Sequence, residues 1–117
     1  MAVEMNPDRF EELVADAVDE IPDELFAKIE NCIWMVEDEP PEDEPELLGF
    51  YDGIPLSERT TSYGVVAPDR IMIFRGPHLR MCVDSDDVAE EVRVTVWHEI
   101  AHYFGIDDDE LDEWGYA

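Results

Sequence analysis

The residues best placed to do chemistry form one short run, His-Glu-Ile-Ala-His, which contains His98, Glu99 and His102. On a helix, side chains at positions i and i+4 lie on one face, about 5–6 Å apart at Cβ. Two imidazoles at that spacing can reach a single Zn²⁺, which binds histidine nitrogen at about 2.0–2.1 Å. Glu99 would lie about 100° further round the helix than His98, beside the metal without being a ligand. The run therefore predicts His98 and His102 as zinc ligands and Glu99 as the base that takes a proton from metal-held water.

A third, oxygen ligand is expected just after this run. Residues 98–108 read HEIAHYFGIDD, so Gly105 and Asp108 complete the pattern HExxHxxGxxD. A glycine after the last helical residue ends a helix, and the turn it permits can bring Asp108 back to the metal. Three protein ligands and one open position for water make a catalytic zinc site, whereas four protein ligands make a structural one. Asp108 is the predicted third ligand, and Glu110 or Glu113 could replace it at short range.

The segment that carries these residues has the pattern of an amphipathic helix over about 85–104. Its apolar side chains recur at every fourth position: Val88, Val92, Val96 and Ile100. Such spacing places them on one buried face, and the run Asp84-Ser85-Asp86 offers caps for the helix start. The alternative is an ordinary core helix with a buried histidine pair, but two imidazoles and a carboxylate buried together need partners that offset their desolvation.

Shorter helices are expected on either side of the chain's central part. Asn6 and Pro7 suit the cap and the first position of a helix. A second short helix is predicted to start at Pro22, and a final acidic turn or short helix is expected over 108–114.

Strands are expected in the middle of the chain. Residues 32–36 read as a buried strand, residues 71–74 as a second strand, and residues 79–83 as a third short one. The charged, proline-rich residues 37–46 predict a loop, because proline cannot donate a sheet hydrogen bond. Residues 47–55 are apolar but broken by glycines, which indicates irregular structure or a short strand.

Composition limits the partners and the compartment. Thirty-two Asp and Glu against seven Lys and Arg give a net charge of −25, and such a field repels nucleic acid and anionic membrane surfaces. Cys32 and Cys82 belong to no CxxC pair, so we expect neither a disulfide nor a metal role for them. Because there is no signal-peptide pattern and no apolar stretch of membrane-spanning length, a cytoplasmic location is expected.

Two further residues are candidates for a part in the chemistry. His78 lies in a Gly-Pro-His-Leu run, which favours a surface histidine in a turn over a substrate contact. Tyr103 follows His102 directly and therefore points about 100° away from it. It is expected to pack inside the protein rather than to stabilise a reaction intermediate.

Taken together, these stretches resemble the small bacterial zincin-like metallopeptidase family over nearly the whole chain. The resemblance is carried by TVWHEIAHYFGIDDDELDEWG, PDRIMIFRGP, LLGFYDGIPLSER and the opening FEELVADAVDEIPDELFAKIENCIWMVEDEP. It implies a compact α+β fold in one domain over 1–117, with a small mixed sheet, N-terminal helices and a C-terminal active-site helix. It also implies a zinc site at His98 and His102, with Glu99 as base.

The function expected from the sequence is a zinc-dependent, peptidase-like hydrolase that acts on a peptide or protein. The substrate would lie extended along an edge strand, because strand pairing binds a peptide backbone without demanding particular side chains. The alternative is a zincin-fold binding module with a structural metal and little or no activity. The small size of the chain favours this alternative, and an open water position on the metal would favour the enzyme.

Overall fold

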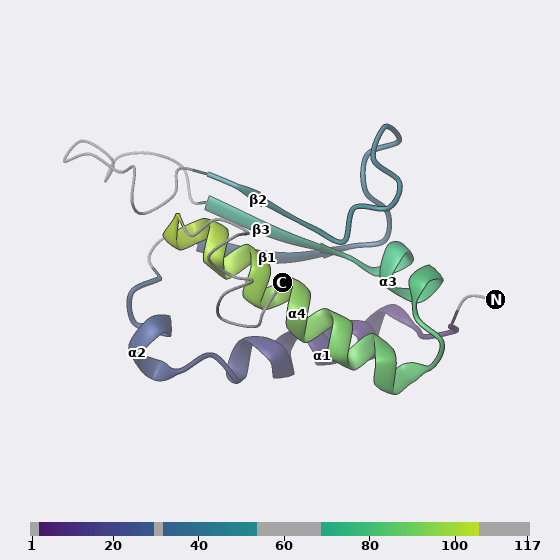
Figure 1. Cartoon of the computed structure of the whole chain (residues 1–117), viewed down its shortest axis with the longest axis horizontal. Helices are drawn as coiled ribbons and strands as arrows, with labels where there is room; N and C mark the ends of the chain where they lie inside the picture. Colours follow the sequence, from purple (N-terminus) through teal and green to yellow (C-terminus); the bar gives the residue numbers. More distant parts are fainter. Residues whose placement is uncertain (1–2, 30–31, 54–68, 106–117) are drawn as a thin grey trace.

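The computed structural model describes residues 3–29, 32–53 and 69–105, which form one layer of sheet and one layer of helix (Figure 1). The elements in chain order are α1 (Pro7–Asp19), α2 (Asp23–Phe26), β1 (Cys32–Glu37), β2 (Gly49–Asp52), β3 (Asp69–Phe74), α3 (Arg75–Met81) and α4 (Ser85–Phe104). Helices α1 and α4 pack on each other beside the sheet. The α+β class with a small mixed sheet is confirmed, and the helix expected over 108–114 lies outside the described residues.

The sheet has the order β1-β3-β2, with β3 in the centre. Strand β1 runs parallel to β3, with Cys32 opposite Asp69. Strand β2 runs antiparallel to β3, with Gly49 opposite Ile73. The strand expected at 32–36 is confirmed in place, but the expectation that it is buried is wrong. Ile33 is 47% exposed, and the other residues over 32–36 are only half-buried. A side strand packs only one face on the core, so alternate residues face outward.

Helix α4 begins and ends where its sequence predicts. The Asp84 side chain accepts a hydrogen bond from the Asp87 backbone N–H at 2.8 Å, which satisfies a donor that has no partner inside the helix. Gly105 ends the helix with φ of 79°, a left-handed conformation that costs glycine little. The stripe of valines is fully buried, with Val88, Val92 and Val96 each at 0% exposure. The core between α4 and the sheet therefore fixes which face of α4 points outward.

The third strand expected over 79–83 is wrong, because residues 79–81 form the end of helix α3 and residues 82–83 connect α3 to α4. Pro77 lies in the first turn of α3, where a missing N–H removes no helix hydrogen bond. Gly76 and Pro77 therefore start a helix instead of forming a turn between strands. Within the described residues, neither α3 nor any other helix is both long and apolar enough to span a membrane.

Candidate active site

Helix α4 holds His98 and His102 next to each other on its outward face. Their ring centroids are 4.9 Å apart and their planes are nearly perpendicular, at 83°. Both residues are half-buried, so the rings can be approached from outside. The helical spacing thus brings two imidazoles together as the sequence predicts, because one turn of helix separates them.

Glu99 lies beside this pair and is almost completely enclosed, with 5% exposure. Its Oε1 is 3.1 Å from Nδ1 of His102. On its other side the carboxylate meets β2 at Gly49, where an added Cβ would lie 3.1 Å from Glu99 Oε2 and 2.8 Å from Cγ2 of Thr95. Glycine at position 49 therefore leaves the room that the carboxylate occupies.

A groove of about 290 Å³ opens above these side chains. Its floor is the face of α4 from Glu91 to Glu99, including Thr95 and His98, and its opposite wall is the chain that leads into β2, including Leu48 and Gly49. The groove therefore borders β2 at Gly49 as well as the side chains of His98 and Glu99. The sequence did not reveal this wall, because residues 46–49 lie about 50 positions before the histidines; the only signal was the glycine that interrupts an apolar run.

A buried histidine holds the helix under this groove. His78 is 0% exposed, so the expectation of a surface histidine is wrong. Its Nδ1 is 2.7 Å from the Phe74 carbonyl, to which it donates, and its Nε2 is 2.9 Å from the Thr95 hydroxyl. Burial lowers the pKa of His78 below the ordinary value, although hydrogen bonds to backbone oppose this shift. His78 therefore links α3 to α4 one turn before Glu99.

Aromatic rings fix β2 beside α4 at the other end of the site. Tyr103 is fully buried and meets the ring of Tyr51 edge to face, with centroids 6.1 Å apart. The Tyr51 hydroxyl donates a 2.5 Å hydrogen bond to the buried Asp69 carboxylate on β3. The expectation that Tyr103 packs inside the protein is confirmed, and its ring helps to set the distance between β2 and the helix.

The donor set fits two positions of a zinc site. Half-buried imidazoles side by side are typical zinc ligands, and a catalytic site needs one more protein ligand and a water. Across residues 3–29, 32–53 and 69–105, no group of three or more His, Cys, Asp or Glu side chains is arranged to hold a metal ion. Asp108, Glu110 and Glu113, the candidates for the third ligand, lie outside these residues.

Comparison with known proteins agrees with this arrangement. The family described as zincin-like metallopeptidase matches residues 29–116, which include the whole sheet, α3 and α4. The chain therefore belongs to the zincin-like metallopeptidase family. No curated protein matches the sequence.

A solved structure shows the same fold. It is a conserved hypothetical protein from Thermus thermophilus, similar to this chain with a TM-score of 0.62 and 24% sequence identity. The match covers 86% of this chain and 94% of that protein. At this identity the likeness concerns the fold alone.

Proposed function

We propose that this protein is a zinc-dependent, peptidase-like hydrolase. The observation that carries the proposal is the position of Glu99, a nearly buried carboxylate 3.1 Å from His102 at the edge of an open groove. A carboxylate beside ligating histidines is not needed to hold a metal ion, but it is needed to move a proton. Family membership supports the same class of chemistry.

Each residue of the candidate site has a distinct part in the proposed reaction. His98 and His102 would hold the zinc, with Asp108 as the third ligand. Zinc, when bound, supplies a lowered pKa for a coordinated water and polarises the scissile carbonyl. Glu99 takes a proton from the attacking water and later passes it to the leaving amine. Because Glu99 is almost fully enclosed and its Oε1 lies 3.1 Å from Nδ1 of His102, the carboxylate is positioned before substrate arrives, which reduces the cost of ordering it.

Strand β2 is the proposed binding edge for the substrate backbone. In the described part of the chain β2 pairs only with β3, and it borders the groove at Gly49. An extended peptide can add to such an edge through backbone hydrogen bonds. This would align the scissile bond along α4 near His98 and Glu99.

The variant Glu99→Gln tests the proposal, because glutamine keeps the shape of the side chain but cannot act as a base. We expect it to retain its fold and its zinc while peptide hydrolysis falls about 10²–10⁴-fold, the usual contribution of general acid–base catalysis. The measurement is cleavage of a broad peptide library by zinc-loaded protein, followed by mass spectrometry. Glu90→Gln is the matched control, since Glu90 is an exposed residue of the same helix.

Two results would contradict the proposal. Hydrolysis that is unchanged in Glu99→Gln would remove Glu99 from the mechanism. If neither protein cleaves the library and the metal is held by four protein ligands without water, the protein is a binding module with a structural metal.

A further inference from the structure

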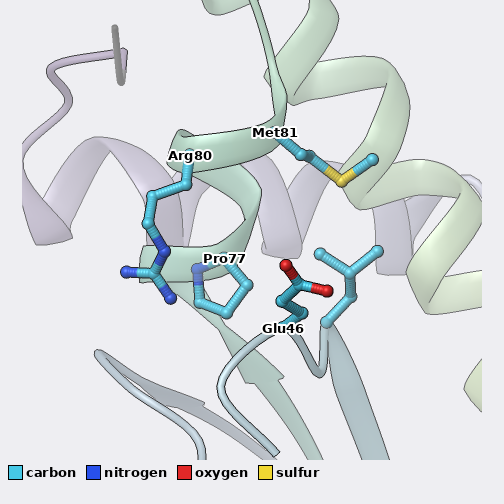
Figure 2. Close-up of a pocket in the computed structure, with 5 residues that line it drawn as sticks. Glu46, Pro77, Arg80 and Met81 are labelled. Atoms are coloured by element: carbon cyan, nitrogen blue, oxygen red, sulfur yellow. The ribbon is translucent and has the colours of Figure 1, made fainter.

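A second hollow of about 370 Å³ lies next to the candidate active site, between α3 and the chain leading into β2. Figure 2 shows Pro77, Arg80 and Met81 of α3 on one side of it and Glu46 on the other. Leu48 completes its lining. We call it the Met81 pocket.

The Met81 pocket continues the groove over His98 and Glu99. Glu46 and Leu48 line both hollows, so a ligand that follows this segment passes from one into the other. Along α4 the groove extends from Glu91 to Glu99, about 12 Å at 1.5 Å per helical residue. An extended peptide covers about 3.3 Å per residue, so a chain that follows the groove spans it in roughly four residues.

The lining of the Met81 pocket suits an apolar side chain. Met81 is 53% exposed, so its side chain is available to a ligand that enters the pocket. Methionine is flexible and polarisable, so it adapts to differently shaped apolar partners. Leu48 and Pro77 supply the rest of the apolar surface.

The charges around the Met81 pocket favour a cation beside that apolar group. Arg80 is already compensated, because its guanidinium donates to both Glu39 oxygens at 2.9 and 3.0 Å and to the Pro45 carbonyl at 3.0 Å. The pKa of Arg80 is raised chiefly by its hydrogen bond to Glu39 and to a smaller extent by Glu46. The Glu46 carboxylate points into the pocket (Figure 2), and Glu91 adds a second carboxylate on the floor of the groove. A positively charged residue of a ligand would therefore be attracted to this stretch.

We propose that the Met81 pocket is a specificity subsite for a peptide substrate, which places a large apolar side chain between Leu48, Pro77 and Met81 and a basic residue against Glu46. This inference rests on the proposed function and names its substrate class. The apolar residue lies about four positions from the scissile bond, and the basic residue lies between the two.

The test compares Met81→Asp with Val83→Asp in the zinc-loaded protein. Val83 is the matched control, because it is 83% exposed and follows closely after Met81 without lining either hollow. In library cleavage the wild type should favour products with a Leu, Phe or Met about four positions from the cut. We expect Met81→Asp to abolish that preference, Glu46→Lys to reverse the preference for Lys and Arg, and Val83→Asp to leave both unchanged.

A binding measurement separates this inference from the proposed function. The probe is a fluorescent octapeptide with one Phe and two Lys, and its anisotropy is followed as Glu99→Gln protein is added. The same peptide with Ser in place of Phe is the control. Weakening of about tenfold or more by Met81→Asp, with no change in Val83→Asp, is the expected result even if no peptide is ever cleaved. Equal binding of the Phe and Ser peptides, or equal effects of the two Asp variants, would overturn the subsite. Cleavage that depends on Glu99 but shows no preference for an apolar residue would also overturn the subsite, while the hydrolase proposal would stand.

Discussion

Helices α3 and α4 each place histidine close to the groove, and they use it in opposite ways. On α3, His78 is fully buried and both of its ring nitrogens are within hydrogen-bond distance of protein oxygens. On α4, His98 and His102 are half-buried, and His98 lines the groove. The same side chain is thus a structural link in one helix and a candidate metal ligand in the next.

Environment decides between these roles. A ring whose two nitrogens contact a backbone carbonyl and a hydroxyl has no lone pair facing solvent with which to bind a metal. Paired rings one turn apart at a groove can converge on one ion. His78 contributes to the site only indirectly, since Thr95 lies one helical turn before Glu99 and touches the same glycine.

The largest expected effect comes from removing the buried histidine, in His78→Ala, and it is an effect on stability. The change removes two hydrogen bonds, leaves the Phe74 carbonyl and the Thr95 hydroxyl without this partner, and opens a cavity beside the Phe10 ring. Together these should lower the free energy of unfolding by about 2–4 kcal/mol. The measurement is urea denaturation. His78→Asn keeps a donor near the Phe74 carbonyl, so its free energy of unfolding should fall less. Equal losses of unfolding free energy in the two variants would show that packing alone explains the effect.

A smaller effect is expected where β2 meets α4, in Gly49→Ala. The new methyl group would lie 2.8 Å from Thr95 Cγ2 and 3.1 Å from Glu99 Oε2, so β2 or both of these side chains must move. Overpacking of this kind costs about 1–3 kcal/mol, and hydrolysis should fall further than stability alone explains. Gly53→Ala is unsuitable as a control, because its Cβ would meet the Asp69 carboxylate. Ala15→Ser, on the exposed face of α1, should change neither quantity, and full activity in Gly49→Ala would contradict the close approach.

The smallest effect concerns pH, and it follows from the lowered pKa of His78. Below its ordinary value of 6.5 the unfolded chain takes up a proton at His78 while the folded protein resists it. The folded state therefore loses stability as pH falls from 7 towards 5. To isolate the contribution of His78, the quantity to follow is the difference in unfolding free energy between wild type and His78→Asn. This difference should narrow as pH falls; a difference that widens would mean that the buried ring prefers the charged form.

The sequence was most informative where local signals agree with each other. For α4, the Asp84 cap, the spacing-four apolar stripe and Gly105 all indicate the same helix, and the structure confirms it. The histidine pair follows from that helix, since its placement needs only the helical repeat. These features depend on neighbours in the sequence, so a single chain is enough to predict them.

Features that depend on distant contacts could not be predicted. Helix α3 is short, and its Gly76-Pro77 start has the composition of a turn, so only packing against α4 reveals it. His78 becomes buried because Thr95 and Phe10 surround it in space. The groove likewise depends on residues 46–49 lying over α4, a contact that no local pattern encodes.

The central claim, that the α4 pair binds the metal and His78 does not, can be tested directly by counting zinc. Wild-type protein, the His98→Ala/His102→Ala double variant and His78→Asn would be loaded with zinc, desalted and measured by elemental analysis against protein concentration. We expect one zinc per chain in wild type and in His78→Asn, and none in the double variant. Stoichiometric zinc in the double variant would contradict the account, because the metal would then be held elsewhere in the chain.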